Sequence, residues 1–373
     1  MSRLRLAIVG CGSICERGLL PHLLLERDRV QVSALCDMSE ARLEMLAEKF
    51  AVPKTFTNVE ELLHTSEAEA IAIATPIPLH YEQARSALLQ GRHVYVQKTM
   101  TQTVKEAEEL IRIAKEQGLV LAASPGQMLL PAYWRARELV TAGALGIIYT
   151  AFGINMAPGH EHEALRKHAK QADANVDPTW YYRAGSGPLR DMGVYSLHAI
   201  TGILGRARKV LSFANRPMPE RSWNNKSIPV EVDDNIALIL ELEQHRLATV
   251  CTTFSADPPI RSWGLAISGS EGALDIRRLP GKTSRYELMM SRMGETNVEP
   301  QEFGTGLDQR HEALEEAHVA RDLLDFVDAV LNARPPQASA EHACHVIAII
   351  EAAECAARTG SVVEIPRTPH GDA

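Results

Sequence analysis

The sequence predicts an α/β protein of two domains, in which a doubly wound parallel sheet precedes an α+β domain with a mainly antiparallel sheet. In roughly the first 125 residues, short apolar runs alternate with amphipathic stretches in about six βα-type units, the pattern of a parallel sheet with crossover helices. The later apolar runs are longer and are joined by short hairpin connections such as Gln244-His245. The length of 373 residues is sufficient for two domains, which we place at 1–124 and 125–373.

Composition excludes several classes of protein. The formal net charge of −8, without a basic run, argues against a nucleic-acid partner. The sequence has no run of about 18 apolar residues, so we predict no membrane span. The N-terminus leads directly into a strand without a signal-peptide pattern, so we expect a cytoplasmic protein. Six scattered cysteines lack C-x-x-C spacing, which favours free thiols over disulfides or metal ligands.

The first strand leads into a glycine loop. Four apolar residues, 6–9, precede Gly10 and Gly12, and leucines at helical spacing follow. This strand–turn–helix order is typical of the start of a Rossmann fold, in which the first glycine allows the tight turn and the second lets the backbone approach a pyrophosphate. The third small position of the fingerprint is Cys15, which still permits close packing of helix on strand. The residues predicted to hold the pyrophosphate, with the free N–H groups of the helix start, are Gly10, Gly12, Ser13 and Ile14.

An acidic residue ends the second strand. Asp37 follows the predicted strand 30–36 at roughly the spacing from Gly12 that the fingerprint requires. Its carboxylate can accept hydrogen bonds from the ribose hydroxyls and would repel a 2′-phosphate, which favours NAD over NADP as cofactor. The alternative is that Asp37 only ends a strand and that the glycines form an ordinary turn.

Polar residues follow three later strands of the same sheet. In an open α/β sheet the ligand lies at the carboxyl ends of the strands, where these residues are expected. The additional candidates for cofactor contact at this edge are Thr75, Pro76, His80, Gln97, Lys98 and Gln127.

Four motifs together give the chain a resemblance to the Gfo/Idh/MocA family, which includes glucose–fructose oxidoreductase and inositol dehydrogenase. They are Gly10-Cys11-Gly12, Thr75-Pro76 with His80, Lys98, and the segment 187–198. The resemblance covers almost the whole chain. It implies a second domain with a large open sheet and NAD(P)-dependent hydride transfer on sugars, polyols or related alcohols.

Two motifs depart from the family pattern. The usual Glu-Lys-Pro reads Gln97-Lys98-Thr99, so only the lysine is kept. The usual Asp-x-Gly-x-His-x-x-Asp has Tyr195 at the histidine position and His198 at the final aspartate. The glucose–fructose oxidoreductase branch carries tyrosine at the position of Tyr195, so the resemblance is compatible with a tyrosine as acid or base.

Oxidation of an alcohol needs a group that takes the hydroxyl proton and a cofactor that takes the hydride. We expect Lys98 and Tyr195 to form the proton-handling pair, because a lysine cation lowers the pKa of a nearby phenol. Asp191, one helical turn before Tyr195, is expected to orient Lys98 or a substrate hydroxyl. The alternatives are a strand-end lysine, a core tyrosine and a helix N-terminal acid without catalytic roles.

Substrate contacts are expected from a second group of residues. Aromatic faces stack on sugar rings and an arginine binds hydroxyls or a carboxylate, whereas ordinary packing remains the alternative for each residue. Besides Lys98, Asp191 and Tyr195, the substrate-binding candidates are His160, Trp180, Arg183 and His198. The histidines at 160, 162 and 168 lack a second compact ligand pair, so we predict no metal.

Three functions remain open at this point. The first is a sugar or cyclitol dehydrogenase or reductase with NAD. The second is a redox-assisted glycoside hydrolase or lyase that keeps NAD bound, and the third is a non-catalytic sugar sensor. The substrate, the oxidised carbon and the direction of reaction are not encoded in these motifs. Because an open sheet face needs a cover, we expect a homodimer or homotetramer through the C-terminal sheet.

Overall fold

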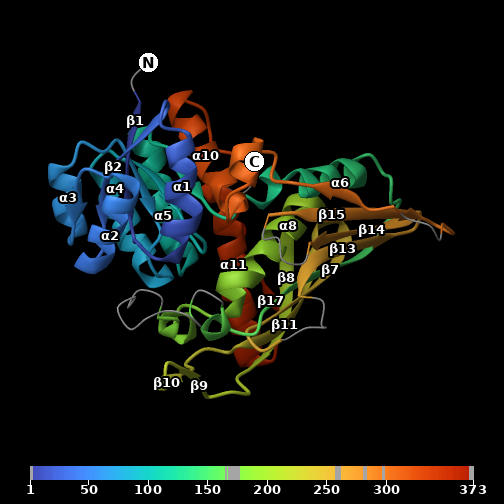
Figure 1. Cartoon of the computed structure of the whole chain (residues 1–373). Helices are drawn as coiled ribbons and strands as arrows, with labels where there is room; N and C mark the ends of the chain where they lie inside the picture. The colour runs from blue at the N-terminus through green and yellow to red at the C-terminus, as the bar shows by residue number, and fades with distance from the viewer. Residues whose placement is uncertain are drawn as a thin grey trace. The chain divides into compact units, whose positions relative to one another are not determined.

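The computed structural model describes residues 3–163, 166, 177–256, 262–279, 284–295 and 299–368. The contacts divide this part of the chain into two compact units. The first contains residues 3–126 and 307–344, and the second contains the described residues between 127 and 306 together with 345–368. Figure 1 labels several of the elements of each unit.

The first unit is built on a six-stranded parallel sheet with the order β3-β2-β1-β4-β5-β6. This is the Rossmann strand order that the sequence predicts. The strands are β1 (Leu4–Val9), β2 (Val30–Cys36), β3 (Thr55–Phe56), β4 (Ala70–Ile73), β5 (His93–Val96) and β6 (Leu121–Ala123).

Short helices connect these strands. Their ends follow local sequence signals: Thr103 and Glu106 form a capping box at the start of α5, and Gly118 ends that helix in the left-handed conformation, with a φ of 65°. The helices are η1 (Cys15–Leu19), α1 (Leu20–Leu25), α2 (Glu40–Phe50), α3 (Val59–Thr65), η2 (Ile77–Leu79), α4 (His80–Leu89) and α5 (Val104–Gln117).

A segment from late in the sequence completes the first unit. It contains α9 (Gln309–Glu312) and α10 (Ala317–Leu331), and α10 buries Leu323 and Phe326 in the same core as β1 and β2. The division predicted at residue 124 assigns this segment to the second domain, whereas its contacts group it with the first, because its apolar face covers the parallel sheet. The sequence also predicts one helix over 311–331, which the structure interrupts near Glu316, a residue with a φ of 54°.

The second unit is built on a nine-stranded sheet with the order β16-β15-β14-β13-β7-β12-β11-β8-β17. All neighbours are antiparallel except β7 and β12, so the predicted large, mainly antiparallel sheet is confirmed. Its strands are β7 (Ile148–Met156), β8 (Ala207–Asn215), β11 (Asn235–Leu242), β12 (Leu247–Thr253), β13 (Trp263–Gly269), β14 (Gly272–Arg278), β15 (Tyr286–Arg292), β16 (Gln301–Phe303) and β17 (Val363–Glu364).

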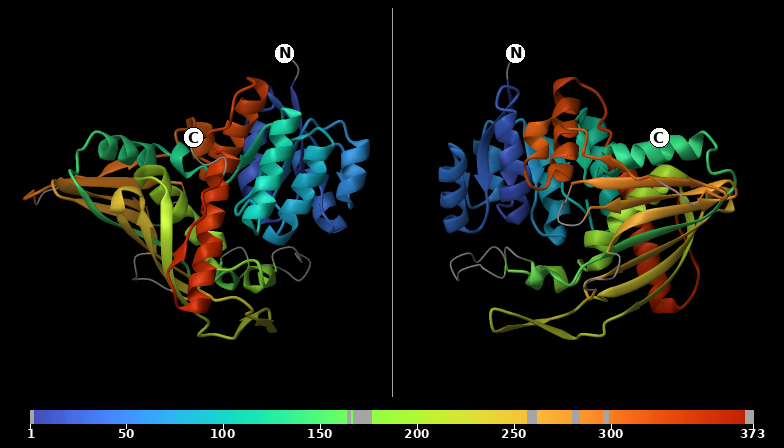
Figure 2. Two further views of the ribbon diagram at one scale, coloured as in Figure 1. Left: turned by 180° about the vertical axis from the view of Figure 1, so that it is seen from behind. Right: turned by 45° about the vertical axis from the view of Figure 1, so that its right-hand side comes forward.

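Helices cover one face of this sheet. Figure 2 shows α8 (Val194–Leu204) and the part of α11 (Ala340–Thr359) that belongs to this unit beside the strands. A Cβ at Gly153 of β7 would lie 2.6 Å from the Cβ of Ser196, so a glycine is needed for α8 to pack this closely. The remaining elements are η3 (Gln127–Leu129), α6 (Pro131–Thr141), η4 (His160–His162), η6 (Thr179–Tyr182), η7 (Leu189–Gly193), η8 (Glu243–His245) and the hairpin β9 (Glu220–Trp223) with β10 (Lys226–Pro229).

Within the described residues, no helix combines the length and the apolar character that a membrane span requires.

Candidate active site

The glycine loop after β1 has the geometry of a phosphate cradle. Gly10 has a φ of 97°, and a Cβ there would lie 2.6 Å from the carbonyl carbon of Ala74 at the end of β4. A Cβ at Gly12 would meet no described heavy atom within 4 Å. Gly10 is therefore needed for the turn, whereas Gly12 leaves open space over the backbone, where a pyrophosphate fits. Ser13 and Ile14 begin the helical segment that follows, so their N–H groups lie at a helix start.

Asp37 lies beside this loop and stabilises it. One carboxylate oxygen accepts a hydrogen bond from the backbone N–H of Cys11 at 2.7 Å, and the other accepts one from Ser39 at 2.9 Å. Because a carboxylate oxygen can accept more than one hydrogen bond, the half-buried carboxylate can hold the loop and also accept ribose hydroxyls.

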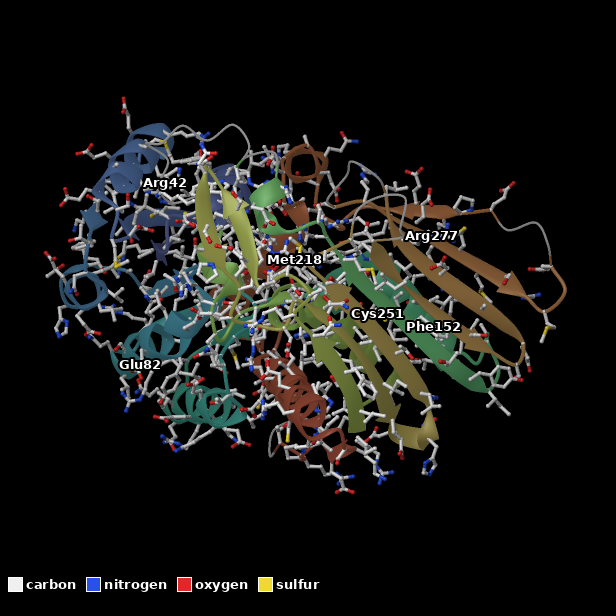
Figure 3. All side chains as sticks on the ribbon, turned by 90° about the horizontal axis from the view of Figure 1, so that it is seen from below. Arg42, Glu82, Phe152, Met218, Cys251 and Arg277 are labelled. Carbon is white, nitrogen blue, oxygen red and sulfur yellow. The ribbon has the colours of Figure 1, made fainter. Side chains whose placement is uncertain are left out.

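Arg42 is a part of this site that sequence reasoning missed. It is buried on α2, where its Nε and Nη2 donate to the carbonyl oxygen of Cys11 at 3.0 and 2.9 Å and Nη2 pairs with Glu16 at 2.9 Å. Figure 3 labels Arg42 in this part of the chain. Because its guanidinium is engaged by the loop, Arg42 is not poised to receive a 2′-phosphate.

His80 connects two loops at the carboxyl ends of the strands. Its ring is fully buried, and the two ring nitrogens lie 2.7 Å from the carbonyl oxygen of Thr75 and 2.9 Å from that of Thr99. Thr75 also donates its hydroxyl to Gln83 at 2.7 Å. His80, predicted as a cofactor contact, therefore braces the Thr75-Pro76 turn against the segment after Lys98.

The residues around Lys98 form a buried polar chain. Lys98 itself is half-buried and is joined to Thr99 by a cis peptide bond. Gln97 donates to the hydroxyl of Tyr95 at 2.6 Å, and Tyr95 donates to Asp322 of α10 at 3.1 Å. Burial raises the pKa of the Asp322 carboxyl to about 6, although hydrogen bonds from neighbouring groups oppose this rise. The carboxylate in this series of hydrogen bonds is therefore Asp322 of α10. At position 97 the chain has the amide Gln97, where the family pattern has a glutamate.

In the second unit, His160 lies between two carboxylates. Its Nε2 is 2.8 Å from Asp191 Oδ2, and its Nδ1 is 2.6 Å from Glu163 Oε1. Burial opposes a charge on the imidazole, but the two carboxylates outweigh it and raise the pKa of His160. Arg166 pairs with Glu163 as well. The predicted residues Asp191 and His160 are thus brought together, and each fixes the orientation of the other.

Aromatic rings stack on this cluster. Tyr181 lies over His160 with ring centroids 3.4 Å apart, and Trp180 stacks on Tyr181 at 3.8 Å. Burial and the nearby Asp191 raise the pKa of Tyr181, so its phenol stays neutral. Arg183 is exposed and pairs with Glu231.

Asp191 and Tyr195 lie on one continuous helical segment. Asp191 is buried in η7, a π-helical turn, and Tyr195 is in the first turn of α8. The ring of Tyr195 is also buried and meets Trp263 edge to face at 5.1 Å. His198, one turn later, is buried. Gln127 is buried at the start of η3, and its Nε2 has no hydrogen-bond partner among the described residues.

A second buried network supports the His160 loop. Arg221 donates to Glu161 at 2.8 Å and to Asp234 at 2.7 Å, and Tyr182 donates its hydroxyl to Glu161. A Cβ at Gly159 would lie 2.5 Å from Arg221, so only glycine fits there.

Sequence reasoning missed the roles of these supporting residues together with Glu163 and Arg166, whereas Tyr181, next to Trp180, follows from the expectation of an aromatic face for a sugar ring. The one sequence signal for part of the set is the three-residue spacing of 160, 163 and 166. In the described residues, no group of three or more metal-ligating side chains is close enough to hold a metal ion, and His168 lies outside them.

Two family models match this chain, in successive segments. Residues 4–124 match the family model described as "Oxidoreductase family, NAD-binding Rossmann fold", and residues 133–275 match the GFO/IDH/MocA C-terminal domain. The D-xylose dehydrogenase of Paenarthrobacter nicotinovorans is 28% identical over 58% of this chain, but the match spans only 54% of that enzyme. The trans-1,2-dihydrobenzene-1,2-diol dehydrogenase of Mus musculus is 26% identical over 74% of this chain and 75% of its own length.

A solved structure shows the same fold over nearly the whole chain. Levoglucosan dehydrogenase in complex with NADH and levoglucosan has a TM-score of 0.81 at 18% identity and covers 98% of this chain and 100% of its own. With a glycine loop that fits a pyrophosphate and a carboxylate that fits a ribose, the first unit is an NAD-binding domain. The chain belongs to the GFO/IDH/MocA family of oxidoreductases.

Proposed function

We propose that the protein oxidises a hydroxyl-bearing carbon of a sugar, cyclitol or related polyol with NAD, or catalyses the reverse reduction. The observation that carries this proposal is the helical segment on which Asp191 and Tyr195 stand one turn apart, with the Asp191 carboxylate held at 2.8 Å by His160. A neutral substrate with several hydroxyls suits a buried carboxylate that accepts and a phenol that both donates and accepts. Relatives whose names state a sugar substrate support the same class.

We assign the transfer of the substrate's hydroxyl proton to side chains of this protein. When bound, NAD accepts the hydride from the reacting carbon. We assign the hydroxyl proton to Tyr195, with Lys98 as the cation that favours the phenolate. Asp191 is assigned to hold a substrate hydroxyl, because His160 fixes its carboxylate. Lys98 belongs to the first unit and Tyr195 to the second, so this pairing rests on the motifs of the sequence.

Sugar binding is assigned to the aromatic stack and its neighbours. A ring face of Trp180 or Tyr181 provides an apolar platform for the C–H groups of a sugar. We assign His160 to substrate binding through its contact with Asp191. We assign His198 to substrate binding because it lies on the same helix face as Asp191 and Tyr195. Arg183 is exposed and pairs with Glu231, so we assign it no more than an outer contact with the substrate.

Two experiments identify cofactor and substrate class. Mass spectrometry of the small molecules released from the purified protein should find NAD or NADH. A panel of sugars, cyclitols and polyols with NAD should then give steady NADH formation with at least one member. Turnover of a glycoside without NADH accumulation would instead favour the redox-assisted hydrolase or lyase, and binding without any turnover would favour a sensor.

Asp37→Ala should narrow the preference for NAD over NADP. The unmodified protein should bind NAD more tightly, because the carboxylate accepts ribose hydroxyls and repels a 2′-phosphate, and Arg42 is engaged by Cys11. Dissociation constants from NADH and NADPH fluorescence give the comparison. Equal or tighter NADPH binding by the unmodified protein would contradict the assignment.

We also propose that two copies associate through the outer face of the nine-stranded sheet. Cross-strand pairing aligns Leu211, Ile239, Thr249 and Phe152 in one row and Phe213, Ala237, Cys251 and Ile154 in the next. Phe213 is 71% exposed, and Figure 3 labels Phe152 and Cys251 on their neighbouring strands. We assign a second copy of this chain as the cover of this exposed apolar face.

Phe213→Asp should therefore halve the mass measured by light scattering, because a charge would be buried within the interface. Met218→Asp is the matched control, since Met218 is an exposed apolar residue outside the strands of the sheet. A monomeric unmodified protein, or an oligomer that Phe213→Asp leaves intact, would contradict the proposal.

A further inference from the structure

The second unit contains a cavity that the proposed reaction does not use. It has a volume of about 290 Å³ and lies between the sheet and the end of α11. Ser212, Ala214 and Ile236 of β8 and β11 line one side, and Ala353 and Ala357 of α11 line another. The loop 184–187 closes a third side. All these residues belong to the second unit, so the cavity is a feature of that unit alone.

Two serine hydroxyls in the lining are buried and have no partner among the described residues. Ser212 is 2% exposed and Ser186 is 7% exposed, and within this part of the chain neither Oγ has a hydrogen-bond partner. A buried hydroxyl without a partner is destabilising, and a polar cavity is where a water or a ligand group can satisfy it. The volume is several times the roughly 30 Å³ that one water takes up in the liquid, so the cavity can admit a larger molecule.

Ionic groups in the lining add further acceptors and donors. Arg190 forms a two-pronged pair with Glu354, with Nε to Oε1 and Nη2 to Oε2 both at 2.8 Å. Glu354 remains 37% exposed, so its carboxylate can also accept hydrogen bonds from a ligand. The other charged lining residues are Arg358, Glu231 and Asp233, which gives three acids and two bases in total.

The lining also restricts the chemistry and size of a ligand. The balance of charge offers no net attraction for an anion, while hydroxyls and a carboxylate suit a molecule that both donates and accepts hydrogen bonds. Alanines and glycines provide small apolar surfaces against which C–H groups pack. The volume stands at the lower end of the range for ligand pockets, which suits a single six-membered ring.

We propose that this cavity binds a neutral polyhydroxylated compound of the size of one monosaccharide or cyclitol. Lys98, Asp191, Tyr195 and His160 do not line it, so it is a second site, separate from the groups assigned to the reaction. Arg190 directly precedes Asp191 in η7, so a ligand that contacts Arg190 can influence the position of the neighbouring carboxylate. The proposal goes beyond the oxidation of a polyol and does not depend on it.

Three variants separate the cavity from the rest of the unit. Ala357→Leu fills the cavity from α11, and Ser212→Ala removes one buried hydroxyl without adding volume. Ser222→Ala is the matched control, because Ser222 is an exposed serine of β9 outside the lining. Ser212→Ala keeps the test valid if the larger leucine disturbs folding.

The test is titration calorimetry of the full-length protein saturated with NADH. The probes are myo-inositol and D-glucose, with cyclohexanol as an apolar ring control and D-glucuronate as an anionic one. We expect a probe polyol to bind, with affinity lowered at least about tenfold in Ala357→Leu, lowered in Ser212→Ala, and unchanged in Ser222→Ala. Turnover of any sugar that the enzyme oxidises should stay within about twofold in Ala357→Leu.

The outcomes that would overturn the proposal are distinct from failure of the oxidoreductase assignment. Equal polyol affinity in Ala357→Leu, Ser212→Ala and the unmodified protein would place binding elsewhere, whatever the turnover. Absence of polyol binding at the highest soluble concentration would remove the site. Tighter binding of glucuronate or cyclohexanol than of the neutral polyols would show that the ligand class is wrong.

Discussion

Replacing Lys98 with methionine should lower kcat/KM for oxidation of an active sugar by at least about two orders of magnitude. Methionine keeps the length and apolar stem of the side chain but removes the cation proposed to favour the Tyr195 phenolate. The backbone around position 98 should persist, because His80 braces it through Thr99 and the Gln97–Tyr95–Asp322 chain lies beside it. Steady-state kinetics and NADH titration of the same preparation give rate and cofactor affinity separately.

The affinity for NADH is the second measurement needed for Lys98→Met. The glycine loop and Asp37 are untouched, so NADH binding should be largely retained. Lys105→Met, at an exposed lysine of α5, should leave both values unchanged. Near-normal turnover in Lys98→Met would remove Lys98 from the mechanism.

Tyr195→Phe should abolish most activity and flatten its dependence on pH. The phenyl ring keeps the edge-to-face contact with Trp263, so the fold should survive while the hydroxyl is lost. In the unmodified enzyme, alcohol oxidation should rise with pH and level off in the alkaline range, because a tyrosine starts near a pKa of about 10 and a lysine cation lowers it. The apparent pKa belongs to the coupled groups.

The structure defines the charges around Asp191 that bear on this profile. Asp191 is bonded to His160, whose pKa is raised by the two carboxylates against the effect of burial. A protonated His160 would offset part of the negative potential that Asp191 exerts on a phenol. The measurement is the pH dependence of kcat/KM for both proteins on one sugar. An unchanged profile in Tyr195→Phe would transfer the proton role to Lys98 or His198.

Elements with strong local patterns were predictable from the sequence. The six parallel strands are short, apolar and separated by amphipathic helices with caps, such as the capping box at Thr103, so local and tertiary preferences agree. The break in the helix near Glu316 was not predictable from the sequence, because glutamate favours helices but is held there with a positive φ. The grouping of 307–344 with the first unit depends on which sheet α10 covers, which periodicity alone does not specify.

In the candidate site, too, the features set by local sequence were predictable, and those set by tertiary packing were not. The glycine loop and Asp37 follow from spacing within one βαβ unit, so their neighbourhood was predictable. The His160–Asp191 contact joins residues 31 positions apart, and the Arg221 network joins four segments of the second unit. Such contacts are products of tertiary packing, and Arg42 carries no local signature that separates it from a surface charge.

The central claim is that the chain transfers a hydride from a sugar carbon to NAD and releases the products. The most direct measurement incubates the enzyme with NAD and an active panel sugar that is deuterated at every carbon-bound position, followed by mass spectrometry of the free cofactor and the sugar product. The account predicts free NADH that carries one deuterium and a product that has lost one deuterium from the reacting carbon and one hydrogen from its hydroxyl. Conversion of the substrate without deuterated NADH in solution, or reduced cofactor without deuterium, would contradict it.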